Sequence, residues 1–587
     1  MYGKPYNYYT LVNLFDGVLL YQSVLIGLLV GLVLGFIDSY GYAVTGYTTC
    51  EISVLTAPVL VVLVFNLILR RKPYINEVLL ASAIAIGMNL TTAITAGMYI
   101  TYTILAEAPI VSRLGLIVPQ WLYMSSEQLR IDTIAIYLHL TLVSAGGIAL
   151  AYAFSKHFLE RERLMFPLGS ASAMLVSISI VKGVRGLLMI LVGLIFEMMY
   201  LIFGPFTIDF TTQLQSILQG SSLALTLDVF IFLIALVIPL NASIGISLGN
   251  FIAYLVLLPI LVMLRALYVP PGMGALDMPS LASPELASIV VGFIIVASLY
   301  YTAVNIRVYF HTFSRFRLKH DELIALIICL LLVFTLPIVT VVLDPQSLTI
   351  RFLPIFILLP LLHFFLALVT VRVVGEVGVA SQSILPIASV VMYTMGYRGA
   401  TGYVILDPYT GIPMPEFMAG SSMNVIKASK ILGVNSKLVI VTLFLGILIG
   451  APITLYYGHL LLSVYGLNSP KFPLVRWLPI VTWMAGLYTG RLDIINFHAL
   501  ILGIIAAIII LAIIKVSGLT QITLFSILIG LTLTPDYGIL FLVASVIKYI
   551  ISRISSVAHE ALLLSAACAL AGAGLAIIVY TIVCLVI

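Results

Sequence analysis

Long apolar runs, separated by short polar or charged segments, extend from Leu20 to the last residue, Ile587. About 20 apolar residues suffice for a helix to cross the hydrocarbon core of a bilayer, so the pattern predicts about sixteen spans or half-spans. The clearest runs are 20–37, 78–104, 133–154, 187–203, 324–342, 352–370, 438–462, 498–514 and 561–587. In the first run, Gly27, Gly31 and Gly35 form a doubled GxxxG motif, which is typical of close helix packing. The predicted fold class is an all-α polytopic membrane protein.

Small-residue segments interrupt several runs, and three kinds of interruption recur in the same order in each half of the chain. The first half has TGYTTCEIS, FPLGSASAML and PLNASIGISLG, and the second half has GEVGVASQS, FMAGSSMNVI and LTPDYGILFL. Internal duplication is usual in secondary transporters, whose binding site lies where the repeats meet. We therefore predict two related membrane halves, 1–310 and 311–587, with broken or re-entrant helices and no soluble domain.

The composition excludes a soluble protein. The 587 residues are 62% hydrophobic and only 9% charged, whereas a soluble domain carries about 25% charged residues. The net charge is +5, and the positive residues fall mostly in short segments such as 70–72 and 156–163, where they set the orientation of spans. We predict a multi-pass protein of the cell membrane, with a cytoplasmic N-terminus and no nucleic-acid partner.

No pattern in the chain is typical of a metal centre or a membrane enzyme. The four cysteines have no CxxC spacing, and the eight histidines are scattered without an HExxH motif. We predict no catalytic residue, no cofactor and no metal site, apart from metal carried inside a bound chelate. An integral membrane enzyme acting on lipid-linked substrates is the alternative class, together with an uncoupled channel or membrane subunit.

The segment RVVGEVGVASQ, residues 372–382, contains the first candidate for a functional site. It places Glu376 between Gly375 and Gly378, at the end of one apolar run and before another. A carboxylate at membrane depth faces protein or a wet cavity and is a functional candidate. The glycines let the backbone unwind or approach a ligand closely. On a continuous helix, however, Arg372 lies one turn before Glu376, and the two could simply pair.

Two Gly-Ser segments are predicted to begin helices, and an acid occupies a third polar segment. Gly169 and Ser170 belong to the first segment. The second segment contains Gly420, Ser421, Ser422 and Asn424. Unpaired N–H groups at a helix N-terminus suit an anionic ligand, although a plain helix start explains the proline before Gly169 equally well. Glu51 lies among hydroxyl-bearing residues, which either satisfy it or line a polar cavity with it.

The order of these motifs resembles the oligopeptide transporter superfamily, which includes the yellow stripe-like transporters of metal chelates. The similar segments are LVGLVLGFIDSYGYAVTGYTT, RERLMFPLGSA, GEVG, which corresponds to a GETG-type motif, and MAGSSMNVIKASKIL. The chain departs from the family pattern at Val377, where threonine is common, and at Val379 and Ala380. The resemblance implies a cation-coupled secondary transporter, usually driven by protons, for small peptides or metal chelates.

We therefore expect a central site where the GEVG segment meets the two Gly-Ser helix starts. Substrate carboxylates would bind at the helix N-termini, and Glu376 would bind the coupling proton or a substrate amine, with Arg372 tuning it. The expected partners are a small peptide or chelate, a coupling cation and the lipid bilayer. The substrate, the ion, the direction of transport and the formation of a homo-oligomer stay open at this point.

Overall fold

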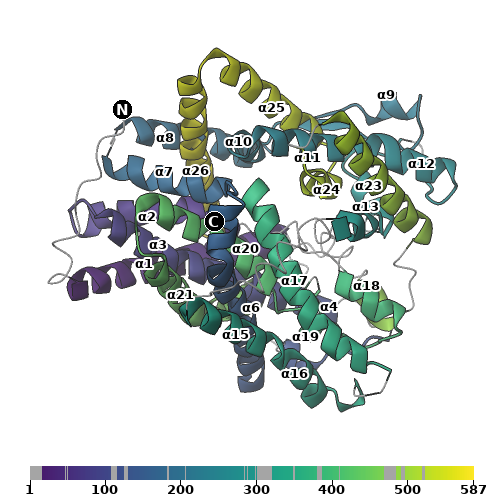
Figure 1. Ribbon diagram of the computed structural model, residues 1–587, viewed down its shortest axis with the longest axis horizontal. Coiled ribbons are helices and arrows are strands. Elements are labelled where there is room, and N and C mark those ends of the chain that lie inside the picture. Colours follow the sequence, from purple (N-terminus) through teal and green to yellow (C-terminus); the bar gives the residue numbers. More distant parts are fainter. Residues whose placement is uncertain are drawn as a thin grey trace.

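The structure is a computed structural model and describes residues 16–586 except 46–47, 49, 108–114, 124–129, 182–183, 205, 271, 283, 287, 298, 301–319, 348, 350, 380–386, 409, 468–480, 482–483, 491–495 and 519–521. Within the described residues, 11 helices are long and apolar enough to cross a membrane. Two further apolar helices, 188–203 and 284–297, are shorter. The chain is an all-α membrane protein, as the pattern of apolar runs predicts (Figure 1). The predicted boundary between the halves, 310–311, lies outside the described residues.

The first part of the chain contains most of the helices that are interrupted or joined by tight turns. Its α-helices are α1 (Asp16–Thr45), α2 (Ser53–Ile68), α3 (Ile75–Thr92), α4 (Met98–Glu107), α6 (Ile131–Lys156), α7 (Pro167–Val181), α8 (Val184–Phe203), α9 (Thr211–Gln215), α10 (Val229–Val237), α11 (Leu240–Ile252), α12 (Leu258–Met263) and α13 (Met278–Leu281). Short 3-10 or π segments are η1 (Cys50–Ile52), η2 (Ala93–Gly97), η3 (Gln120–Leu122), η4 (His157–Arg161) and η5 (Ala253–Leu257).

The second part contains both long and short helices. They are α15 (His320–Val333), α16 (Thr335–Leu343), α17 (Leu353–Val377), α18 (Ile387–Thr394), α19 (Ala400–Leu406), α20 (Pro415–Leu432), α21 (Ser436–Tyr465), α23 (Phe497–Ser517), α24 (Leu524–Thr532), α25 (Tyr537–Ile554) and α26 (Ser556–Val586), with the 3-10 turn η6 (Pro345–Ser347). The break predicted at TPDYG is present, because α24 ends before it and α25 begins within it.

One predicted interruption differs from the observed one, and the structure decides between two alternatives elsewhere. The segment 239–250 is not a long break, because only Ile238 and Pro239 separate α10 from α11 and the rest is helical. The last span could be one tilted helix or could break near Gly572 and Gly574, and it is one helix. The segment 164–175 could be re-entrant or a short tilted helix, and it begins the helix α7. Small residues in these segments therefore serve helix packing more often than they end a helix.

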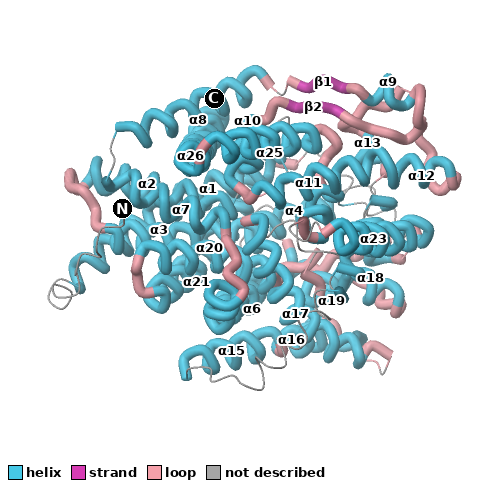
Figure 2. Tube along the Cα trace, turned by 45° about the horizontal axis from the view of Figure 1, so that its top comes forward, coloured by secondary structure: helices cyan, strands magenta, loops and turns pink. Residues whose placement is uncertain are grey.

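A short antiparallel hairpin follows α8 and was not predicted. Its strands are β1 (Thr207–Asp209) and β2 (Ala224–Thr226), and Thr207 pairs with Thr226. The hydroxyls of these two threonines lie 2.9 Å apart. The hairpin lies at one edge of the molecule, next to α9 (Figure 2). Three-residue strands are too short to produce a recognisable alternation of polar and apolar positions.

Helices that are far apart in the sequence pack closely through glycines on both partners. In Figure 1 the purple α1 and α3 lie beside the green α21. A Cβ atom at Gly87 of α3 would lie 2.2 Å from the carbonyl oxygen of Leu443, and one at Gly446 of α21 would lie 2.2 Å from that of Ile84. Neither position therefore accepts a larger side chain without moving a helix, as expected for small-residue contacts between membrane helices.

Two more helix pairs repeat this reciprocal arrangement. In the contact of α8 with α26, Cβ atoms at Gly193 and Gly572 would each lie 1.9 Å from a carbonyl oxygen of the other helix. In the contact of α11 with α24, Cβ atoms at Gly249 and Gly530 would lie 1.9 Å and 2.0 Å from such oxygens. Each pair joins a helix of the first part of the chain to one of the second, so the two parts form one packed unit.

The glycines of α1 are also packing residues, as the doubled GxxxG motif predicts. A Cβ atom at Gly27 would lie 2.6 Å from the carbonyl oxygen of Ala81, and one at Gly31 would lie 2.5 Å from the sulfur of Met88. Both contacts are with α3, so α1 rests directly on the backbone and side chains of that helix.

The helix α20 lies at the centre of the molecule. Every residue from Pro415 to Ile426 is buried, and the helix packs against α6, α7, α17 and α21. Its first turn is anchored by Glu416, whose Oε1 lies 2.6 Å from Nδ1 of His363 on α17. The other ring nitrogen of His363 donates to the carbonyl oxygen of Leu406 at 2.9 Å. A helix with so many polar residues is stable at this depth only because protein surrounds it.

We expect Gly446→Ala to separate α3 from α21 and to lower stability by about 1–3 kcal/mol, because the added methyl group meets a backbone oxygen. Thermal unfolding of the purified protein measures the effect. Gly41→Ala on α1 is the matched control, since a Cβ atom there has nothing within 4 Å. Equal unfolding temperatures for the two variants would contradict the packing described for Gly446.

Candidate functional site

The segment predicted as a break is the end of a continuous helix. The helix α17 continues through Gly375 and Glu376 to Val377, so the prediction of an interruption at Gly375 is wrong. The helix ends at Gly378, whose φ of 99° is left-handed. Glycine adopts this conformation without the cost that a side chain adds, and it commonly ends helices for that reason. Glu376 therefore lies in the last turn of a helix, directly before the point where the chain changes direction.

The end of α17 meets the start of α7, and Asn424 of α20 joins the two. The backbone N–H of Phe166, just before α7, donates to the carbonyl oxygen of Gly375 at 2.9 Å. The Asn424 side chain donates from Nδ2 to the carbonyl oxygen of Gly378 at 2.9 Å and accepts at Oδ1 from the N–H of Gly169 at 3.1 Å. Backbone groups at a helix end inside a membrane need such partners. The structure thus brings together three segments that the motif analysis singled out.

Glycines allow this close approach, and the atoms that they approach belong to neighbouring segments of the chain. A Cβ atom at Gly169 would lie 2.3 Å from the carbonyl oxygen of Asn424. A Cβ atom at Gly375 would lie 2.6 Å from the side chain of Leu164, and one at Gly378 would lie 3.0 Å from that of Leu168. The glycines of the GEVG segment therefore make room for the loop and helix around α7, which is a packing role.

Glu376 belongs to a network of charged side chains beside this junction. Oε1 of Glu376 lies 3.6 Å from Nε of Arg372, so the simple pairing on a continuous helix does occur. The guanidinium of Arg372 makes its shorter contact, 2.9 Å, to Oε2 of Glu162. Oε1 of Glu162 lies in turn 2.8 Å from Nε2 of His157. Oε2 of Glu376 is buried and has no hydrogen-bond partner among the described residues. Such an atom is open to a proton or a polar ligand.

The two Gly-Ser segments differ in where they lie on their helices. The helix α7 begins at Pro167, so Gly169 and Ser170 lie in its first turn. The helix α20 begins at Pro415, so Gly420, Ser421 and Ser422 lie inside it and not at its N-terminus. The prediction that they begin a helix is therefore wrong, because the polar first turn at Pro415–Glu416 already starts it. Ser170 and Ser422 donate to carbonyl oxygens of their own segments, those of Met165 and Ala419.

Ser421 instead reaches the first part of the chain. Its hydroxyl donates to Oε1 of Glu51 at 3.4 Å. Glu51 lies in the short turn η1 and is only 5% exposed. Of the two alternatives for Glu51, a hydroxyl as hydrogen-bond partner is therefore present, and this hydroxyl belongs to α20. An acid of the first part of the chain and the central helix of the second part thus meet in the protein interior.

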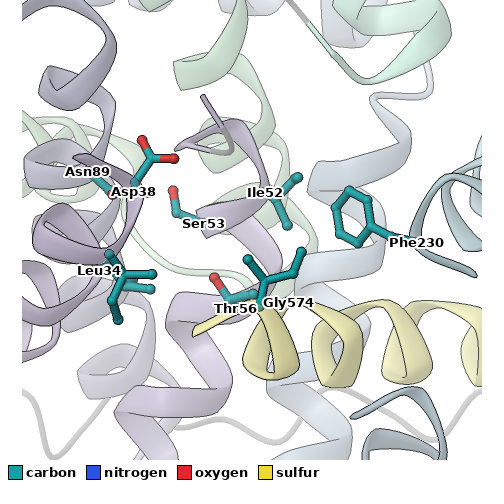
Figure 3. A pocket seen from close by; sticks show the side chains of 10 residues that line it. Leu34, Asp38, Ile52, Ser53, Thr56, Asn89, Phe230 and Gly574 are labelled. Carbon is teal, nitrogen blue, oxygen red and sulfur yellow. The ribbon is translucent and has the colours of Figure 1, made fainter. Parts of the chain in front are cut away.

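Ile52 and Ser53, the two residues that follow Glu51, line a small cavity. It has a volume of about 30 Å³ and is lined by both polar and apolar side chains. Figure 3 shows Asp38, Asn89 and Ser53 together, with Ile52 and Phe230 on the far side. Asp38 comes from α1, Asn89 from α3 and Ser53 from the start of α2, so three helices contribute oxygen atoms to one space.

Asp38 is the central polar residue of this cavity. It is 3% exposed, and its Oδ2 accepts hydrogen bonds from the hydroxyl of Thr48, at 2.8 Å, and from that of Thr92. Asp38 was missed as a site residue because the predicted helix ended at Ile37, which placed the acid in a loop. The observed α1 continues to Thr45. The available signal was an acid within one turn of a long apolar run, in a chain whose span 78–104 carries polar residues at positions 89, 92 and 95.

The described residues contain no group of three or more His, Cys, Asp and Glu side chains that could hold a metal ion. The polar atoms around the cavity are carboxylate, amide and hydroxyl oxygens. Oxygen atoms of these kinds suit hard cations or hydroxyl and amine groups of a solute, and they do not suit soft transition metals.

The fold and these sites define a class: an all-α, multi-pass membrane protein whose polar residues meet in its interior at helix ends. A comparison with protein-family models and with curated protein sequences finds no match for this chain. The class therefore rests on the sequence and the structure of this chain, and its activity is proposed below.

We expect Asn424→Leu to loosen the junction of α7 and α17, because the carbonyl of Gly378 and the N–H of Gly169 both lose their partner. Each buried backbone group left without a hydrogen bond costs about 1–3 kcal/mol. Hydrogen exchange of the segment 164–170, compared with the unfolding temperature, measures the change.

Asn435→Leu is the control for this substitution, since Asn435 makes one exposed capping bond, to the N–H of Lys437 at 3.0 Å. Unchanged exchange of 164–170 in a folded Asn424→Leu variant would show that the two hydrogen bonds do not hold the junction.

Proposed function

We propose that the protein is a secondary active transporter that moves a small peptide, a peptide-like solute or a metal chelate across the cell membrane, driven by a cation gradient. The observation that carries the proposal is the junction at Asn424, where two helix ends meet inside a membrane protein around buried polar atoms. Broken helices are tolerated at that depth where they line a cavity or are enclosed by protein. In secondary transporters they hold the solute and the ion where the repeats meet.

Two contacts support a transport role over a purely structural one. The hydrogen bond between Ser421 and Glu51 joins α20 to the first part of the chain at a length of 3.4 Å, which is weak enough to break and re-form. The carboxylate of Glu376 keeps one oxygen without a hydrogen-bond partner beside Arg372. A solute amine or a proton that reached this oxygen would compete with Arg372 for the Glu376 carboxylate. This competition would link the binding of the solute or proton to the position of α17.

The solute class rests on the order of the motifs, which resembles the oligopeptide transporter superfamily, and we propose membership of that superfamily. The cavity beside Asp38, about 30 Å³, is far too small for a peptide, since sites for solutes of that size have volumes of roughly 300–1,000 Å³. The solute site would therefore open at the junction of α7, α17 and α20 when these helices separate. The N-terminus is proposed to face the cytoplasm.

We expect the protein, reconstituted in liposomes loaded with unlabelled di- and tripeptides, to accumulate labelled peptide by counterflow. A carrier exchanges solute in this assay, whereas an enzyme or a structural subunit does not. Ser421→Ala should slow the exchange by about tenfold, the equivalent of one lost hydrogen bond to a charged group. Ser429→Ala is the control on the same helix, because that hydroxyl bonds to Ile426 and Ser436. Equal rates for both variants would place the solute elsewhere.

Glu376→Gln should retain counterflow but lose accumulation driven by a pH gradient, because an amide does not gain or lose a proton in this range. Uptake with and without an imposed pH gradient measures the difference. Glu160→Gln is the control, since Glu160 is 62% exposed and pairs with Lys430 at the surface. Full gradient-driven accumulation by Glu376→Gln would rule out a coupling role for this residue.

A further inference from the structure

The cavity beside Asp38 has the chemistry of a site for a small cation. Four oxygen-bearing residues, Asp38, Asn89, Ser53 and Thr56, line it, and each of them is at most 4% exposed. In Figure 3 the oxygen atoms of Asp38, Ser53 and Thr56 lie along the same side of the space. Carboxylate, amide and hydroxyl oxygens are the ligands that hard cations prefer. A cation held by such groups is stable in a protein interior, whereas an unsolvated one is not.

Asn89 provides an observation that is independent of Asp38. Its amide oxygen is buried and has no hydrogen-bond partner among the described residues. A buried acceptor left without a partner costs about 1–3 kcal/mol, so its position on the wall of a cavity calls for a ligand. The hydrogen of Ser53 is already donated to the carbonyl oxygen of Cys50 at 2.5 Å. The Ser53 oxygen can therefore act only as an acceptor or a cation ligand on its cavity side.

Charge and size together select the ion. Asp38 is the one carboxylate among the described residues of the lining, so a monovalent cation leaves this buried site neutral. A divalent cation would leave a net positive charge in a low-dielectric interior, which is costly. The volume of about 30 Å³ gives room for about two water molecules, or for one small ion with a water. Sodium, the smaller of the two common monovalent cations, leaves more of this space for a bound water molecule than potassium does.

We propose that this cavity binds a sodium-sized monovalent cation through Asp38, Asn89, Ser53 and Thr56. Its walls come from α1, α2 and α3, with α26 behind them at Gly574, where a Cβ atom would lie 2.4 Å from the Thr56 methyl group. An ion bound here holds these helices together. Ion binding does not depend on the proposed transport activity; a coupling of the ion to solute movement does rest on it.

The first test is the unfolding temperature of the purified protein in sodium, potassium or choline chloride at one total salt concentration. We expect the temperature to rise with sodium in a saturable way and to rise less with potassium or choline, because an ion that binds only the folded state stabilises it. Equal temperatures in sodium and choline would mean that the cavity holds water only, and the proposal would be overturned.

The second test measures the sodium dependence of the unfolding temperature in variants of the cavity, which shows where the ion binds. Asp38→Asn should remove the sodium dependence, and Thr56→Val should weaken the apparent affinity for sodium about tenfold. Thr141→Val is the matched control, because Thr141 is buried on α6 and donates to the carbonyl oxygen of Tyr137. If Asp38→Asn fails to fold, Thr56→Val and Thr141→Val decide the matter. Equal sodium affinity in these two variants overturns the assignment.

The same preparations separate this proposal from the transporter proposal. A sodium-dependent rise in unfolding temperature without peptide counterflow leaves the cation site standing and overturns peptide transport. Peptide counterflow without any sodium effect on unfolding overturns the cation site alone. A sodium gradient that drives peptide accumulation in the unmodified protein, but not in Thr56→Val, supports both.

Discussion

The need to satisfy backbone groups at helix ends inside the membrane is the constraint on which this structure depends. Hydrocarbon offers no hydrogen bond to a carbonyl or an N–H group, so a chain that turns at that depth must supply its own partners. Asn424 supplies two of them at once, one to the end of α17 and one to the first turn of α7. Because a single side chain serves both, it links the three helices at one point.

Glycine contacts provide the second requirement, which is close approach. Lipid tails are as apolar as leucine, so membrane helices gain little by burying large apolar side chains against each other, and backbone contact through small residues replaces that gain. In this protein the reciprocal pairs Gly87–Gly446 and Gly193–Gly572 join helices from opposite ends of the sequence. The central helices are therefore held together by close backbone contacts at glycines. Polar side chains are not needed for these contacts and can make other interactions.

Those polar side chains are distributed along α20. Glu416 at its start contacts His363, Ser421 contacts Glu51, and Asn424 joins the helix ends. The helix also buries the apolar side chains of Phe417, Met418, Met423 and Ile426, so both apolar packing and hydrogen bonds hold it in place. A ligand that competes for one of its hydrogen-bond partners would favour a shift of the helix.

The sequence by itself determined the class of the protein and most of its helices, because an apolar run long enough to span a bilayer has few alternatives to a helix. It also identified Glu376, Glu51, Gly169 and Asn424 as unusual, since acids and small polar residues are costly in lipid. Only the tertiary structure decided which helix each of them meets. It placed Ser421 within a helix, and it joined Asp38 to Asn89 and Ser53 around one cavity. Contacts between distant segments depend on how whole helices pack, and a local pattern of polar and apolar residues does not encode that arrangement.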